Sequence, residues 1–154
     1  MFEKTCRFAV DNNIFDRGIN DMNINISPIQ CQDKHLVQDL KKIAAKYGIP
    51  FERFHFEITE SRLTDEKAVR ETLTKLKENG AKIALDDFGT GYSNIASIML
   101  MPIDFVKIDK SLLWSYASGD NEFLNELMPM IRGEGKKIIA EGIETEEHIE
   151  ILRR

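Results

Sequence analysis

The stretch Ala84–Asn94, ALDDFGTGYSN, places two consecutive carboxylates at the end of an apolar run. The run from Ile83 to Leu85 predicts a buried strand, and Asp86 and Asp87 follow it at once. A turn rich in glycine, which tolerates positive φ, comes next. Adjacent carboxylates repel each other unless a positive charge lies between them. The stretch therefore predicts a strand whose tip requires a cation.

Strand-like and helix-like runs alternate along the rest of the chain. Short β-type runs predict strands at 22–26, 53–59, 82–87, 105–109 and 137–141. Apolar stripes, caps and terminal glycines predict helices at 2–13, 33–47, 65–79 (capped by Thr64), 93–101, 122–132 and 146–154 (capped by Thr145). Five strands separated by helices indicate an α/β fold with a parallel sheet and right-handed crossovers.

Polar side chains repeat on one face of the predicted strands, because successive residues of a strand alternate between faces. The polar face carries Asn23, Asn25, His55, Glu57, Asp86, Lys107, Asp109 and Glu141. Helices cover both faces of a doubly wound sheet, and both faces should then be apolar. In a (β/α) barrel the polar side chains converge inside, near the C-terminal strand ends where active sites are built. The alternation therefore favours a TIM-like barrel.

Each polar residue taken alone has a structural explanation. A single Asn or Lys in a strand is usually solvated or at an edge, and His55 is more typical of a structural residue than of a ligand. Asp86 and Asp87 could cap a following helix. The triplet Asp87-Phe88-Gly89 matches the metal motif of protein kinases, but the other kinase signatures are absent from this sequence. The indication of a functional site is that polar residues lie at similar positions in five successive predicted strands.

Composition limits the possible functions. The net charge is −5 and no basic cluster of the kind that binds DNA or RNA is present. The sequence contains no apolar run of membrane-spanning length, and its first residues do not resemble a signal peptide. Cys6 and Cys31 fit no metal or redox spacing, so a reduced cytoplasmic compartment is expected. The length of 154 residues suits a single domain.

The polar face offers oxygen donors without thiolates or a pair of histidines. Such a set suits Mg²⁺ or Mn²⁺ better than zinc. Two such ions could clamp a phosphodiester and stabilise its leaving oxygen. Lys107 could orient the attacking water or stabilise charge on the phosphoryl oxygens. These residues predict metal-dependent hydrolysis of a phosphate ester.

Five segments resemble the signatures of a known family. FEITES (56–61), LDDFGTGYSN (85–94), MPIDFVKIDKSLL (101–113) and IIAEGIET (138–145) resemble successive motifs of the EAL domain, and NINISPIQ (23–30) is similar to its Asn-x-Ser-Pro segment. The resemblance runs in order over essentially the whole chain. It implies a modified TIM barrel of bacteria that hydrolyses cyclic di-GMP to linear pGpG with Mg²⁺ or Mn²⁺.

The resemblance also implies a role for each matching residue. The metal ligands would be Asn25, Glu57, Asp86 and Glu141, with Asp87 serving a second metal. Lys107 would contact the attacking water or the shell of the second metal, and the catalytic set would be Lys107, Glu141 and Asp87. The supporting loop and neighbouring residues would be Glu60, Gly89, Thr90, Gly91, Asp109 and Glu144. The loop 88–93 is implicated in dimerisation in this family.

Two family segments are missing from the sequence. No Glu-Ala-Leu tripeptide occurs in the chain, and the later Gln-Gly strand is also absent. A full barrel has eight strands in about 250 residues. We therefore expect residues 1–154 to form a single incomplete EAL domain that self-associates, as a homodimer or in another form, and has weak or no activity alone. The alternative is a non-catalytic EAL-derived module that binds nucleotide or protein.

Overall fold

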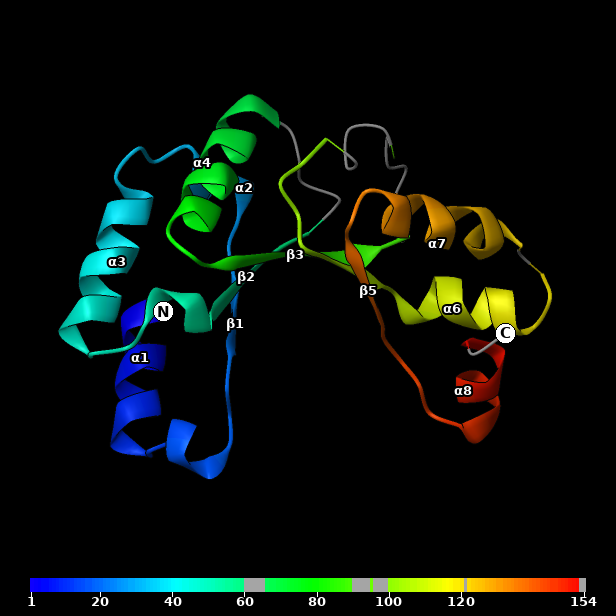
Figure 1. Ribbon diagram of the computed structural model, residues 1–154, viewed down its shortest axis with the longest axis horizontal. Coiled ribbons are helices and arrows are strands. Elements are labelled where there is room, and N and C mark those ends of the chain that lie inside the picture. Colours follow the sequence, from blue (N-terminus) through cyan, green and yellow to red (C-terminus); the bar gives the residue numbers. More distant parts are fainter. Residues whose placement is uncertain (60–65, 90–94, 96–99, 121, 153–154) are drawn as a thin grey trace. The chain divides into compact units, whose positions relative to one another are not determined.

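The computed structural model is an α/β fold and describes residues 1–59, 66–89, 95, 100–120 and 122–152 (Figure 1). Its strands are β1 (Met22–Asn25), β2 (Phe54–Thr59), β3 (Lys82–Phe88), β4 (Phe105–Ile108) and β5 (Lys137–Ala140). They follow one another in the sheet in the order β1-β2-β3-β4-β5. The registered pairs β1–β2, β3–β4 and β4–β5 are parallel. The predicted parallel α/β fold is confirmed.

Helices alternate with these strands. They are α1 (Phe2–Asp11), η1 (Phe15–Arg17), α2 (Pro28–Cys31), α3 (Leu36–Lys46), η2 (Phe51–Arg53), α4 (Glu66–Glu78), α6 (Lys110–Ala117), α7 (Phe123–Gly133) and α8 (Glu146–Leu152). The short helix α2 is capped by Ser27, whose side chain accepts a hydrogen bond from the backbone N–H of Gln30, with Pro28 in the first turn. Among the described residues, no helix is both long and apolar enough to cross a membrane.

Every predicted strand is present, and its ends lie within one residue of the expected ones. Helices α2 and α6 were not predicted, because Pro28–Cys31 shows no apolar periodicity of its own and Asp109 was assigned to the strand 105–109. Asp109 in fact caps α6 by accepting a hydrogen bond from the Ser111 N–H at 2.8 Å. The Thr64 cap and most of the predicted helix 93–101 lie outside the described residues.

The chain divides into two compact units, and the division falls within β3. Unit 1 comprises Met1–Ile58 and Leu63–Ile83, and unit 2 comprises Thr59–Arg62 and Ala84–Arg154.

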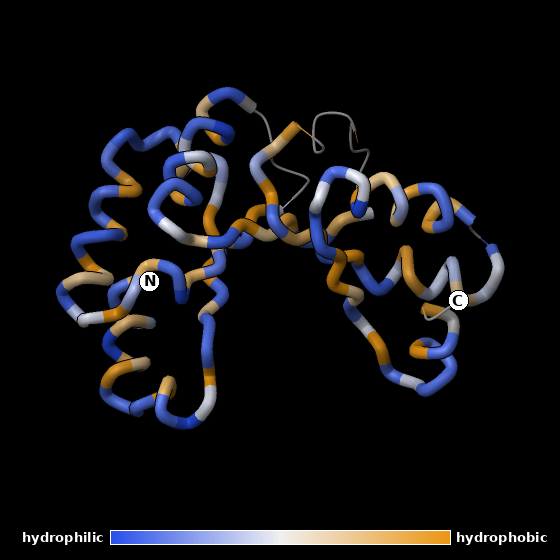
Figure 2. The backbone as a smooth tube through the Cα atoms, viewed as in Figure 1, coloured by the Kyte–Doolittle hydropathy of each residue, from blue (hydrophilic) through white to orange (hydrophobic). Residues whose placement is uncertain are grey.

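The core of unit 1 is built on β2. Phe54 and Phe56 are fully buried, and their rings pack with those of Phe2 and Phe51 at centroid distances of 4.8–6.3 Å. Helix α3 contacts α1 and α4. Figure 2 shows hydrophobic and hydrophilic residues alternating along α1 and α3, as expected of helices with one buried face.

The core of unit 2 lies between β4, β5 and three helices. Val106 and Ile108 of β4 are buried, as are Leu124, Leu127 and Ile131 of α7. Helix α7 contacts β5, and α6 contacts both α7 and α8. The expected alternation holds in β4 but is weaker in β5, whose Ile139 is 41% exposed.

Removal of the Phe54 ring should destabilise the protein most among the unit 1 aromatics. Phe54→Ala leaves a cavity between Phe2, Phe51 and Phe56, and we expect the free energy of unfolding to fall by about 3–5 kcal/mol. Urea denaturation followed by circular dichroism measures this change. Phe8→Ala is the control because Phe8 is 61% exposed on α1, and its effect should stay within about 0.5 kcal/mol. Equal effects of the two variants would contradict the assignment of this core.

Candidate metal centre

Strand β3 contains one more residue than its partner between two paired positions. Leu85 and Phe88 are three residues apart, whereas their partners on β4 are two apart. Asp87 has a φ of 55°, in the left-handed region that few residues other than glycine adopt. A regular strand would direct Asp86 and Asp87 to opposite faces. A β-bulge changes that direction, which explains how two consecutive carboxylates can serve one site.

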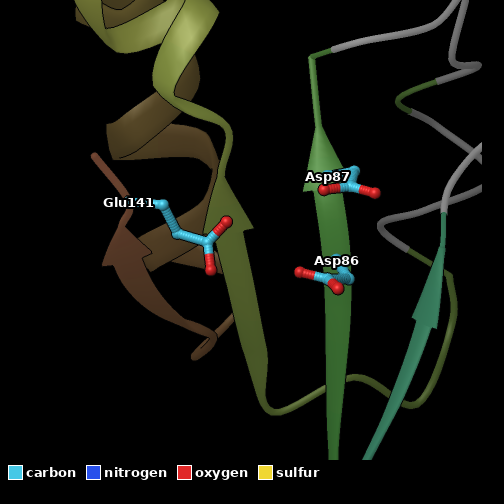
Figure 3. A group of neighbouring side chains, drawn as sticks. All are labelled: Asp86, Asp87 and Glu141. Atoms are coloured by element: carbon cyan, nitrogen blue, oxygen red, sulfur yellow. The ribbon is translucent and has the colours of Figure 1, made fainter. Parts of the chain in front are cut away.

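Three carboxylates gather at this bulge. One oxygen each from Asp86, Asp87 and Glu141 lies within 4.8 Å of the other two. Figure 3 shows the two aspartates in succession on β3 and the Glu141 side chain directed toward that strand. Glu141 directly follows β5, and its backbone N–H donates to the Ile108 carbonyl at 3.1 Å. The ends of β3 and β5 thus supply the cluster.

Lys107 lies on β4, between the strands that carry these acids. Its Nζ is 2.7 Å from Asp86 Oδ1 and 2.8 Å from Glu141 Oε1, and its side chain is only 13% exposed. Charge-assisted bonds of this length are among the stronger polar contacts in proteins. The ammonium is one positive charge of the kind that the aspartate pair requires. Three ionised carboxylates and one ammonium leave a formal charge of −2, which matches a divalent cation.

The charge remaining in the cluster acts on Asp87. Partial burial raises the pKa of the Asp87 carboxyl, and the negative charges of Asp86, Asp109 and Glu141 raise it further. Lys107 opposes this effect but does not cancel it. A cation bound among the three carboxylates would relieve the same repulsion. The donor set therefore fits a hard divalent metal ion.

Two predicted ligands lie next to each other in unit 1. Asn25 of β1 pairs in register with Glu57 of β2, whose side chain is buried. Asn23 Nδ2 donates a hydrogen bond to the Glu57 carboxylate, 2.8 Å from Oε1. The sequence analysis placed Asn23 on the polar face but gave it no role. The period-two spacing from Asn25 was the available signal, because the two residues share one strand face.

The predicted supporting residues have different surroundings in the structure. Asp109 links β3 to α6: its N–H donates to the Phe88 carbonyl at 3.1 Å, and its carboxylate caps the helix. The hydrogen bond from the Ser111 hydroxyl lowers the pKa of Asp109. Glu144 is exposed, and its N–H donates to His148 Nδ1 at 3.4 Å. Gly89 follows β3, whereas Glu60, Thr90 and Gly91 lie outside the described residues.

Parallel strands with acidic side chains at their C-terminal ends are typical of (β/α) enzymes that use metals. Residues 1–154 match the EAL domain throughout, and the chain belongs to the EAL domain family. The resemblance noted in the sequence motifs is confirmed.

Relatives and solved structures agree with this assignment. Cyclic di-GMP phosphodiesterase PdeF of Escherichia coli K12 is 32% identical over 150 residues, which cover 96% of this chain and 20% of PdeF. The EAL domain of Mycobacterium smegmatis DcpA superposes with a TM-score of 0.85 at 32% identity, over 99% of this chain and 70% of that one. The PaMucR phosphodiesterase in complex with cyclic di-GMP gives a TM-score of 0.83 at 29% identity, over 99% and 63%. The chain thus spans about a fifth of the length of the curated relatives it matches.

Asp87→Asn should stabilise the metal-free protein in a pH-dependent way. A carboxyl whose pKa is raised by folding favours the folded state below its ordinary pKa, and this contribution is lost as the pH rises through the raised value. The variant should therefore be more stable than the wild type at pH 7. The difference should shrink as the pH falls toward the ordinary aspartate value of 3.8.

Urea denaturation in the presence of a chelator measures this difference across the pH range. Asp120→Asn is the matched control, because it removes an exposed carboxylate outside the cluster. Asn also tolerates the left-handed region, but that advantage does not depend on pH. A stability difference that stays constant from pH 4 to pH 8 would count against electrostatic crowding at Asp87.

Proposed function

We propose that this chain is part of a metal-dependent phosphodiesterase domain that hydrolyses cyclic di-GMP to linear pGpG. The observation that carries the proposal is the cluster of Asp86, Asp87 and Glu141 around Lys107. The substrate is supported by the PdeF relative, named a cyclic di-GMP phosphodiesterase, and by PaMucR, solved in complex with this nucleotide. A bacterial cytoplasmic location would accord with a second messenger of this kind.

The ion would be Mg²⁺ or Mn²⁺, because the donors are carboxylate oxygens. Asp86, Asp87 and Glu141 would hold it, and the intact domain would hold two. When bound, such an ion supplies Lewis-acid stabilisation of charge on a phosphoryl oxygen. Asn25 and Glu57 remain predicted metal ligands because they match the family motifs. The supporting roles of Glu60 and Glu144 remain predictions for the same reason.

Lys107 has a separate role in the proposed reaction. Its two short bonds hold the ammonium in one place before substrate arrives. A fixed positive charge stabilises the negative charge that develops on the phosphoryl oxygens without further reorganisation. The same ammonium can donate a hydrogen bond to the attacking water and orient it. Asp86 and Glu141 thus act partly by positioning Lys107.

Incubation of the chain with cyclic di-GMP and Mn²⁺, followed by chromatography of the products, tests this function. We expect slow formation of pGpG, in keeping with the weak activity predicted for this chain alone, and only when the metal is present. Lys107→Ala should lower kcat by about 10²- to 10³-fold, the loss typical when one charge-stabilising donor is removed. Lys137→Ala on β5 is the control, because that lysine is exposed and lies outside the cluster. Calorimetry with the same nucleotide accompanies the assay. Binding without turnover would favour a nucleotide-binding module instead, and the absence of both would contradict each function.

The chain is also proposed to self-associate. Strands β1 and β5 stand at the two ends of the strand order, so that each has one edge without a partner strand among the described residues. In unit 1 an apolar pocket lies beside β1, lined chiefly by Phe2, Ile24, Ile26, Leu36, Leu40 and Phe56. Exposed parallel edges and apolar surface favour pairing with a second copy.

Sedimentation velocity over a range of concentrations measures this association. We expect a dimer whose fraction rises with concentration. Ile139→Lys places a charge on the end strand β5, where Ile139 is 41% exposed, and should shift the equilibrium toward monomer, whereas Ile29→Lys changes an exposed residue of α2 and should not. A wild-type chain that stays monomeric and folded at high concentration would contradict the proposal.

A further inference from the structure

Two glycines follow the carboxylates of the metal centre, and both pack against the first turns of α6. Gly89 comes two residues after Asp87 with a φ of +101°, and Gly142 comes directly after Glu141 with a φ of +70°. A Cβ atom at either position would lie against a residue of α6, Leu112 or Lys110 respectively. Unit 2 therefore brings both acid-bearing segments onto one helix.

The space at Gly142 is the more restrictive of the two. A Cβ at Gly142 would overlap the Cβ of Lys110 and lie 3.4 Å from its Cα. These atoms belong to the helix backbone or are attached to it, so that they cannot turn away. At Gly89 the nearest atom is the terminal Cδ2 of Leu112, at 2.6 Å, and a change of rotamer can move it. The Cβ of Leu112 would remain 3.1 Å away, which is tight but does not overlap as the Cβ of Lys110 does at Gly142.

Helix α6 also holds Gly142 by a hydrogen bond. Trp114 Nε1 donates to the Gly142 carbonyl at 3.0 Å. Lys110 and Trp114 are four residues apart and share one face of α6, so the helix contacts Gly142 at two successive turns. The segment that carries Glu141 is thereby attached to α6 on the C-terminal side of its carboxylate.

The start of α6 is attached to β3 in turn. Asp109 caps the helix, and its N–H donates to the Phe88 carbonyl, one residue after Asp87. The first two turns of α6 therefore connect the end of β3 to the segment after β5. These contacts on the C-terminal side of Glu141 add to the hydrogen bond that its own N–H donates to the Ile108 carbonyl.

We propose that Gly142 is a positioning residue of the metal centre. Its lack of a side chain lets the backbone after Glu141 lie against Lys110 and Trp114, and this contact places the Glu141 carboxylate within reach of the two aspartates. The inference rests on the proposed function only in requiring that the cluster binds a divalent ion. A turn residue needed solely for its positive φ would not have this role, and Gly135 provides the comparison. Its φ is +71°, but a Cβ there would meet nothing within 4 Å.

Calorimetric titration with Mn²⁺, without nucleotide, tests the proposal directly. Gly142→Ala should weaken Mn²⁺ binding by roughly 10- to 100-fold, as is typical when residues that orient metal ligands are changed. Gly135→Ala imposes the same backbone strain before β5 and should bind Mn²⁺ as the wild type does. Circular dichroism and thermal unfolding of each variant report whether the fold is kept.

A second pair of variants separates the contact from general destabilisation. Lys110→Gly removes the Cβ that a side chain at position 142 would meet, so the double variant with Gly142→Ala should recover most of the lost affinity. Trp114→Phe keeps the ring but removes the hydrogen bond to Gly142, and it should weaken Mn²⁺ binding several-fold. If Gly142→Ala does not fold, the affinity of Trp114→Phe decides the matter.

The outcomes distinguish the two proposals. A wild-type chain that binds Mn²⁺, with Gly142→Ala binding equally well or Lys110→Gly giving no rescue, would overturn the role of Gly142 and leave the metal centre intact. In the case of an unfolded Gly142→Ala, unchanged affinity of Trp114→Phe would overturn it. A wild-type chain that binds no Mn²⁺ would overturn both this inference and the metal-dependent function.

Discussion

The ammonium of Lys107, held between Asp86 and Glu141, is the interaction on which the centre in unit 2 depends. Three carboxylates cannot share so small a volume without positive charge, and a single lysine compensates only part of theirs. Partial burial and the remaining negative charge together raise the pKa of Asp87. A site of this kind favours cation binding but lowers the stability of the metal-free protein. This conflict between function and stability is common where function requires clustered charge.

Much of the architecture could be predicted because it depends on repeating patterns. The apolar residues Phe54, Phe56 and Ile58 of β2 are all buried, and alternation along that strand identified them. The same alternation placed Lys107 and Asp86 on the polar face. Because β3 and β4 are adjacent strands, these two side chains can form their short ion pair. The stripe of Val69, Leu73 and Leu76 on α4 is likewise buried.

The features that the sequence analysis missed depend on local geometry. Helix α6 was missed because only Asp109 separates the end of β4 at Ile108 from the start of the helix at Lys110. The bulge at Asp87 cannot be recognised from the spacing of apolar residues. The identity of a residue as aspartate also does not show that its backbone adopts the left-handed region. The bond from Asn23 to Glu57 requires knowledge of the register between β1 and β2. Each of these depends on contacts that a linear pattern does not encode.

The extra residue in β3 has a consequence for how this sequence can change. Deletion of one residue between Leu85 and Phe88 would restore regular pairing with β4, but only Asp86 and Asp87 lie between these two positions. The regular strand would therefore carry one carboxylate where the bulged strand carries two. The metal centre therefore constrains the number of residues in β3 as well as their identity. Insertions or deletions in this strand would be tolerated less well than many substitutions.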